Sequence, residues 1–130
     1  MSSIFTKIIN RDLPAYIVAE DNHNIAFLDI YPLVKGHVLV VPKDEVDDLF
    51  DIGIEKYLSL WKFAKKISEA MNKVITCKRI GIAVVGFDVP HAHIHLIPMS
   101  TIQDMNFDNK KIILSQLEFE HIALSIKNAI

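Results

Sequence analysis

The sequence HAHIHLI, residues 91–97, places three of the chain's six histidines at alternate positions with apolar residues between them. Residues two apart in a β-strand point to the same face. The pattern therefore predicts a strand over residues 91–98, with His91, His93 and His95 on one face and the alternating apolar residues packed on the other. Histidine has no strand preference that would explain this repetition, so the three imidazoles are expected to have a chemical role.

A metal site is one interpretation of this row. On a regular strand the Cα atoms of His91 and His95 lie roughly 13 Å apart, whereas two nitrogen ligands of a tetrahedral zinc ion are only about 3.4 Å apart. One ion could bind neighbouring imidazoles but hardly all three, and the single cysteine, Cys77, stands alone in the sequence. No metal and no cofactor is therefore expected.

Catalysis by the imidazoles themselves is the second interpretation. A neutral ring nitrogen is a competent nucleophile towards phosphorus, and neighbouring imidazoles can donate hydrogen bonds to the negative charge that develops. His93 has an imidazole on each side and is the candidate nucleophile. His37, at the start of an apolar stretch that ends at Pro42, could support the row from an adjacent strand.

The rest of the chain predicts strands, a long helix, more strands and a last helix. Apolar spacing indicates a short helix over residues 4–9 and an amphipathic helix over residues 54–74, whose apolar stripe includes Trp61. Ser115 and Glu118 match a capping box that opens the last helix. The stripe around Trp61 is interpreted as core packing or a subunit interface. Further strands are predicted over residues 16–20, 25–29, 37–42 and 80–85.

Composition predicts one cytoplasmic domain over residues 1–130. The chain is 51% hydrophobic, which suffices for one core. Its formal net charge is −2 without a basic cluster, which argues against a nucleic-acid or membrane surface. The single cysteine, Cys77, and the absence of a signal-like N-terminus favour the cytoplasm. No apolar run approaches the roughly 18 to 20 residues that cross a bilayer.

The motif His-φ-His-φ-His-φ-φ at residues 91–97 resembles the signature of the histidine triad (HIT) nucleotide hydrolases and transferases, in particular the HINT-like branch. Three further segments, residues 4–9, 26–30 and 36–43, are similar to family members in order and spacing. The resemblance implies an α+β fold, in which an antiparallel meander of about five strands packs with the central helix and a C-terminal helix follows. It also implies a homodimer that pairs through the central helix and a neighbouring strand.

The resemblance assigns roles to individual residues. His93 matches the nucleophile that attacks an α-phosphate and forms a nucleotidyl-histidine intermediate, which water then hydrolyses. His91 and His95 match histidines that contact the phosphate and order the nucleophile, and His37 matches a supporting histidine. Asp29 matches the carboxylate that accepts hydrogen bonds from the ribose hydroxyls. The purine slot would include Phe5, Ile8, Leu13, Phe27 and Ile30, for which core packing is an equally good explanation, and Asp88 and Val89 are expected to contact substrate.

Two departures from the family pattern change the expectations. Ser3 and Thr6 stand where many bacterial relatives carry the Cys-x-x-Cys half of a zinc site, so that metal is expected to be absent. Phe87 and Asp88 stand near the position of a phosphate-contacting Gln or Ser. A carboxylate close to a phosphate repels it. Asp88 therefore turns away, marks a changed leaving-group preference or orients a triad histidine, and the last of these is our hypothesis.

The implied activity is a nucleotide phosphoramidase or nucleotidyl hydrolase that cleaves purine, in particular adenosine, nucleotide conjugates at the α-phosphate. His95 stands where uridylyltransferase relatives carry Gln, which favours the hydrolases. A competing interpretation is a dinucleoside polyphosphate hydrolase of the Ap4A type, which the missing phosphate-loop Gln weakens slightly. Two further interpretations are a nucleotide-binding regulatory protein with reduced catalysis and a small metal-binding protein.

Overall fold

A computed structural model describes residues 2–130 of the chain. Three α-helices and five β-strands follow one another in the order expected from the sequence, with two short 3-10 helices between them. The helices are α1 (Ile4–Ile9), α2 (Ile54–Val74) and α3 (Gln116–Asn128), the strands are β1 (Ile17–Glu20), β2 (Asn24–Leu28), β3 (Val38–Pro42), β4 (Arg79–Ala83) and β5 (Ile94–Met99), and the 3-10 helices are Leu49–Asp51 and Ile102–Met105.

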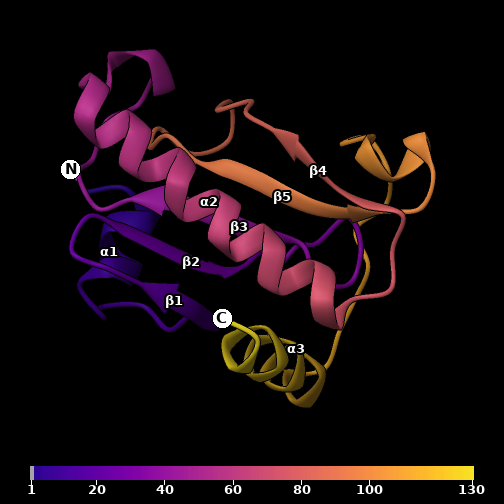
Figure 1. The fold of residues 1–130 in the computed structure, drawn as a ribbon. Coiled ribbons are helices and arrows are strands. Elements are labelled where there is room, and N and C mark those ends of the chain that lie inside the picture. Colours follow the sequence, from indigo (N-terminus) through magenta and orange to yellow (C-terminus); the bar gives the residue numbers. More distant parts are fainter. Residues whose placement is uncertain (1) are drawn as a thin grey trace.

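The five strands form one sheet in the order β1-β2-β3-β5-β4, and every neighbouring pair is antiparallel. Strands β1 to β3 make a meander. The chain then crosses the sheet through α2, returns as the edge strand β4, and places β5 between β3 and β4 (Figure 1). The predicted α+β architecture, with an antiparallel sheet, a central helix and a C-terminal helix, is confirmed.

The two faces of the sheet are buried by different helices. Alternate residues of β2 and β3, such as Ala26 and Val40, join the larger core cluster, which α2 and α3 cover. The intervening residues, such as Phe27 and Leu39, join a smaller cluster under α1. Figure 1 shows α2 lying across one face, with α3 beside it near β1. Because both faces are covered, all residues of β2 and β3 are buried. Their sequences are therefore almost entirely apolar and do not alternate with polar residues.

The helix ends follow the local signals in the sequence. Ser3 caps α1, since its Oγ accepts a hydrogen bond from the backbone N of Thr6 at 3.0 Å. The predicted capping box at the start of α3 is confirmed, because Ser115 and Glu118 each bond the backbone of the other. The predicted span of the central helix, residues 54–74, agrees with α2.

The predicted strand over residues 91–98 is wrong at its N-terminal end, because β5 begins only at Ile94. The backbone N of Ala92 donates to the carbonyl of Val46 at 2.7 Å, outside the sheet, and His91 N donates to Val89 O at 2.8 Å. The partner strand β3 also ends here, at Pro42, which has no amide hydrogen to offer. His91 and His93 therefore lie in an irregular segment that leads into the strand.

Within residues 2–130, none of the helices combines the length and the apolar character that a bilayer crossing requires.

Candidate active site

Four buried histidines lie together near the junction of β3 and β5. The side chains of His37, His91, His93 and His95 are between 0% and 4% exposed. The apolar residues that alternate with the triad (Ala92, Ile94 and Leu96) belong to the α2 side of the core, as the sequence predicts. His95 pairs with Leu39 of the α1 side. The rings of His93 and His95 are 4.9 Å apart, and those of His95 and His37 are 5.1 Å apart.

The backbone determines which nitrogen of His93 carries the proton. Nδ1 of His93 lies 2.7 Å from the carbonyl oxygen of His91. A carbonyl only accepts hydrogen bonds, so Nδ1 must be the protonated donor. In the neutral ring Nε2 then keeps its lone pair. His93 also lines an apolar pocket, so this lone pair is available to an electrophile bound there.

A second chain of hydrogen bonds orients His95. The backbone N of Leu33 donates to Nδ1 of His37 at 3.1 Å, so the neutral His37 ring carries its proton on Nε2. That nitrogen lies 2.9 Å from Nδ1 of His95 and donates to it. Nε2 of His95 is therefore the protonated nitrogen, and it offers an N–H donor beside His93.

Burial keeps these two supporting rings neutral. It is the main cause that lowers the pKa of His37 to about 3, with the charges of His95, Lys111 and His93 adding to it. Burial likewise lowers the pKa of His95 to about 4, helped by His93 and opposed by Asp88. At neutral pH both rings therefore stay in the tautomers that the hydrogen bonds require.

His91 differs from the other two triad residues because partners outside the pocket occupy both of its ring nitrogens. Nε2 donates to the carbonyl of Pro42 at 2.8 Å, and Nδ1 accepts from the hydroxyl of Ser3 at 2.7 Å. The Phe5 ring packs edge-on against both His91 and His93, at 5.8 and 5.0 Å. Mainly because of burial, the pKa of His91 is lowered. His91 thus contributes to the site through its backbone carbonyl.

Glu45 completes the network around His91. Its Oε1 accepts hydrogen bonds from the backbone N of Ser3 at 2.6 Å and from Oγ1 of Thr6 at 2.7 Å. Ser3 and Thr6, where the family resemblance suggests that a metal site is absent, are thus engaged as hydrogen-bonding hydroxyls. Sequence reasoning did not find Glu45, since it is far from the triad along the chain and lies outside the segments that resemble the family.

The pocket beside His93 has a volume of about 160 Å³. Typical small-molecule pockets measure about 300 Å³ or more, so this one can enclose only part of a ligand of that size, and the rest would lie at its mouth. Its described lining includes Pro14 and Ala15 but not Leu13, His37 or His91. The predicted residues that line it are Phe5, Ile8, Phe27, Asp29, Ile30, Asp88, Val89, His93 and His95.

Asp29 lies where β2 ends, and its carboxylate is held by the backbone. Oδ1 accepts a hydrogen bond from Tyr31 N at 2.9 Å, and Oδ2 lies 3.6 Å from Nε2 of His37. Burial raises the pKa of Asp29, the Tyr31 hydrogen bond opposes this rise, and the charge of Asp88 adds to it. A fixed acceptor at the edge of an apolar pocket suits a ligand with hydroxyl donors.

Asp88 does not orient the nucleophile by a hydrogen bond. Its Oδ1 lies 3.8 Å from Nε2 of His93, beyond hydrogen-bond distance, and its side chain is 78% exposed. The orienting contact is the one between His93 and the carbonyl of His91. Our hypothesis that Asp88 orients a triad histidine is therefore not supported for His93, and Asp88 instead marks the solvent-facing mouth of the pocket.

A metal ion could in principle be held by Asp29, His37 and His95, since one ligand atom of each lies within 4.8 Å of the others. The two histidine nitrogens, however, are 2.9 Å apart and share a proton in a hydrogen bond. An ion between them would have to displace this proton and break the chain that starts at Leu33. The donor set is satisfied without a metal.

A neighbouring segment that the sequence did not single out also contacts the site. The Phe107 ring packs edge-on against His95, with ring centroids 4.9 Å apart. Lys111 holds this segment, because its Nζ donates to the carbonyl of Phe107 at 2.6 Å and to that of Asn109 at 3.2 Å. The long loop between β5 and α3 thus packs against His95.

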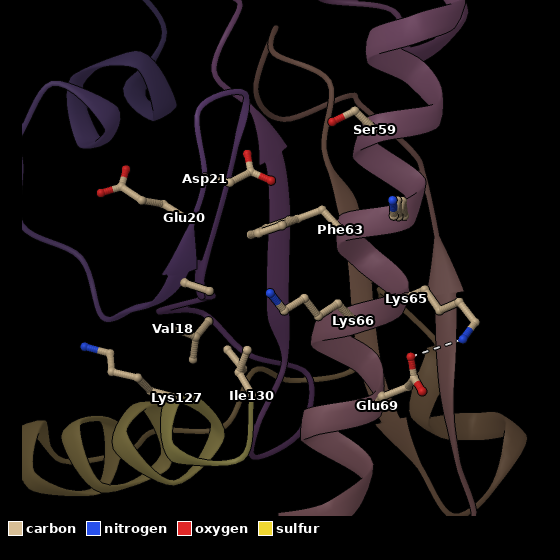
Figure 2. A pocket seen from close by; sticks show the side chains of 12 residues that line it. Val18, Glu20, Asp21, Ser59, Phe63, Lys65, Lys66, Glu69, Lys127 and Ile130 are labelled. Atoms are coloured by element: carbon tan, nitrogen blue, oxygen red, sulfur yellow. Dashed lines mark hydrogen bonds and ion pairs between the residues drawn. The ribbon is translucent and has the colours of Figure 1, made fainter.

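Larger hollows lie elsewhere on the protein. One of about 840 Å³ lies between β1, α2 and α3, where Lys66 and Glu69 border an apolar floor that includes Phe63 (Figure 2). Another, of about 560 Å³, includes Cys77 and His121. The first carries charges of both signs on an open surface. The described lining residues of these two hollows include no triad histidine. The smaller pocket beside His93 is therefore the candidate active site.

Comparisons with known proteins identify the family of the chain. A family model described as "HIT domain" matches residues 10–102. An uncharacterized HIT-like protein of Borreliella burgdorferi is 35% identical over 131 residues, which cover 95% of this chain and 94% of that protein. The adenosine 5'-monophosphoramidase hnt1 of Schizosaccharomyces pombe is 35% identical over 100 residues, or 75% of this chain and 74% of the relative. Among solved structures, a Hit-like protein from Bartonella henselae has a TM-score of 0.86 at 31% identity and covers 99% of this chain and 96% of its own.

Proposed function

Because this chain belongs to the HIT family, we propose that it is a nucleotide phosphoramidase that cleaves the bond between an amine and the α-phosphate of a purine, preferably adenosine, nucleotide. One observation carries this proposal: Nε2 of His93 is left with a free lone pair beside the pocket, because Nδ1 donates to the carbonyl of His91 at 2.7 Å. The activity named for the Schizosaccharomyces pombe relative supports the substrate class.

In the first step, the lone pair of His93 Nε2 attacks the α-phosphorus. The bond from phosphorus to the amine nitrogen breaks, and that nitrogen takes a proton from solvent at the pocket mouth and leaves as an amine. The product on the enzyme is a nucleotidyl-histidine. The Nδ1–H bond to the carbonyl of His91 stabilises the positive charge that the ring acquires.

His95 acts on the phosphate without changing its own protonation state. Its Nε2–H, fixed through His37 and the Leu33 amide, can donate to a non-bridging phosphate oxygen. Removing one such prearranged donor typically costs about 100-fold or more in kcat. His37 is a positioning residue in this scheme, because it acts through His95.

In the second step, water attacks the same phosphorus and the phosphorus bond to His93 breaks. The electron pair returns to Nε2, the water loses a proton, and the nucleoside monophosphate is released. Phe5, Ile8 and Phe27 would hold the base by apolar contact. Asp29 would accept the ribose hydroxyl protons, and its position at the pocket edge supports this role.

Two competing functions are less well supported. A dinucleoside polyphosphate hydrolase has to accommodate a highly anionic leaving group, whereas the mouth of this pocket carries the Asp88 carboxylate. A regulatory protein without catalysis would not need a free lone pair on His93 beside an N–H donor on His95, and the two separate hydrogen-bond chains that produce this pair of tautomers favour turnover.

Rapid-quench kinetics with a labelled adenosine 5'-phosphoramidate tests the proposal. We expect an acid-labile adduct on His93 that forms and decays fast enough to account for turnover. His93→Ala should bind AMP without turnover, while His23→Ala, in an exposed loop, should be fully active, and a chelator should have no effect. Turnover by His93→Ala, or zinc-dependent recovery after chelation, would contradict the mechanism.

A homodimer through α2 and β4 is part of the proposal. Ile54 and Leu58 of α2 are 68% and 59% exposed, and Ile82 of the edge strand β4 is 51% exposed. Ile82 pairs with Leu96, whose side chain faces α2, so these apolar residues share one side of the sheet. Light scattering should give a dimer mass for the wild type and a monomer mass for Ile82→Glu. The single cysteine, Cys77, supports a cytoplasmic location, which we also propose.

A further inference from the structure

The mouth of the active-site pocket is negatively charged. Asp88 and Asp29 both line it, and Asp88 Oδ1 lies 3.8 Å from the nucleophilic nitrogen of His93. Among the described lining residues of this pocket there is no lysine or arginine. The pKa of Asp29 is raised mainly by burial and further by the negative charge of Asp88, which shows that the two carboxylates are close enough to interact electrostatically. Most phosphate sites show the opposite charge.

Lys111, whose charge acts on Asp29, is engaged elsewhere and forms no ion pair with Asp29 or Asp88 among the described residues. The charge of Lys111 influences Asp29 and His37. Its Nζ, however, donates to the carbonyls of Phe107 and Asn109, at 2.6 and 3.2 Å, which ties it to its own loop. The carboxylate of Asp88, at 78% exposure, thus faces solvent without a lysine or arginine partner among the described residues.

The leaving group must pass close to Asp88. Reacting atoms meet at about 3 to 3.5 Å, so the departing atom lies within roughly 5 Å of His93 Nε2, on the far side of phosphorus. The base end is closed by apolar residues such as Phe27 and Ile8, so the leaving group exits at the solvent side. Its atoms are then within the roughly 8 to 10 Å over which charges interact at physiological salt.

We infer that Asp88 selects substrates by the charge of the leaving group, and favours nucleoside phosphoramidates of cationic amines over neutral amines, anionic amines and polyphosphates. The inference rests on the proposed phosphoramidase function. An amine nitrogen that gains a proton as its bond to phosphorus breaks acquires positive charge, which the carboxylate stabilises. A departing polyphosphate gains negative charge at the same point, which the carboxylate opposes.

A series of matched substrates tests this inference. Three adenosine 5'-phosphoramidates of similar chain length carry a free ammonium (1,3-diaminopropane), no charge (propylamine) or a carboxylate (β-alanine). We expect kcat/KM to fall in that order, by about tenfold between the ammonium and the carboxylate substrates. An interaction with an exposed charge changes kcat/KM by up to about fivefold relative to the neutral substrate, upwards for the ammonium and downwards for the carboxylate. Diadenosine tetraphosphate should be cleaved more slowly than all three, and high salt should compress the series.

The variant Asp88→Asn should reduce the spread to about twofold, by slowing the cationic substrate and accelerating the anionic ones. Glu120→Gln is the matched control, because it removes one negative charge on α3, on the opposite side of the sheet. The role of Asp88 would be overturned by equal kcat/KM values for the three substrates in the wild type. It would also be overturned if Asp88→Asn left the differences in kcat/KM between the substrates unchanged. In either case the phosphoramidase proposal would survive if all three substrates formed the His93 adduct, and it would fail if none did.

Discussion

The hydroxyl of Ser3 lies 2.7 Å from Nδ1 of His91, although the two residues are 88 positions apart in the chain. The same hydroxyl caps α1 by accepting from the Thr6 amide at 3.0 Å. Since the carbonyl of His91 in turn holds His93 at 2.7 Å, the start of the chain is coupled to the proposed nucleophile. Glu45 stabilises this coupling through the Ser3 amide.

Ser3→Ala should therefore affect both stability and catalysis. It removes a buried hydrogen bond and a helix cap, and we expect the free energy of unfolding to fall by about 1 to 2 kcal/mol. It should lower kcat more than it changes KM, because Ser3 lies outside the pocket lining. Ser3→Thr should restore much of the unfolding free energy and of kcat. Ser2→Ala, at an exposed position, should change neither quantity. Lost stability with unchanged kcat would limit Ser3 to a structural role.

His37 and His95 should behave as one unit in steady-state kinetics. His95→Ala is expected to lower kcat about 100-fold or more, because the phosphate loses a prearranged donor. His37→Gln should lower it about tenfold, since His95 loses the partner that fixes its tautomer. The double variant should be no slower than His95→Ala, because His37 acts through His95. Independent, additive losses would show that His37 does not act only through His95. His121→Ala, on the exposed face of α3, is the control.

Stability should fall in mild acid. In the folded protein the pKa values of His37 and His95 are lowered to about 3 and 4, from an ordinary value of 6.5. Below pH 6.5 the unfolded chain therefore binds protons that the folded chain does not. The stability present above pH 6.5 is lost as the pH falls towards 4, at up to about 1.4 kcal/mol per pH unit for each histidine. Asp29, with its raised pKa, opposes this loss at the acid end.

Urea titrations between pH 7 and pH 5 measure this slope. His37→Gln should flatten the curve of unfolding free energy against pH, while the exposed His23→Gln should leave it unchanged. A wild-type curve that is flat over this interval would mean that the two buried histidines take up protons without unfolding.

Gly36→Ala should destabilise the turn that leads into β3 and His37. Gly36 has a φ of +91°, and a Cβ there would lie 2.5 Å from Cδ1 of Ile75. We expect a loss of about 2 kcal/mol in denaturant titrations. Ile75→Ala should relieve the steric part but not the backbone strain. Gly53→Ala is the control, because its φ is −57° and its Cβ would meet no atom within 4 Å, so equal losses at both glycines would refute the explanation.

Local pattern was sufficient to predict most of the fold. The alternation of residues 92–96 put Ala92, Ile94 and Leu96 in the core and the triad on the opposite side, as found. The helical period predicted α2, and the Ser115 and Glu118 pair predicted the start of α3. The alternation, the helical period and the capping pair are all local patterns, so they are visible in the sequence.

The alternating pattern could not show where β5 begins. His91 and His93 fit the same period as His95, yet they precede the strand because Pro42 ends its partner and the Ala92 amide turns to Val46. The position of Leu13 outside the pocket lining likewise depends on how α1 and the following turn pack. A strand boundary of this kind is set by the neighbouring strand, which local sequence does not specify.

The sequence by itself determined that three imidazoles lie near one another and that His93 is the central one. Only the tertiary structure decided which nitrogen of each ring is free. Ser3 and Pro42 occupy both nitrogens of His91, the His91 carbonyl leaves Nε2 of His93 unprotonated, and the Leu33 amide acts through His37 to leave an N–H on His95. A histidine has the same two nitrogens wherever it occurs, and their protonation is set by hydrogen-bond partners that folding brings from distant parts of the chain.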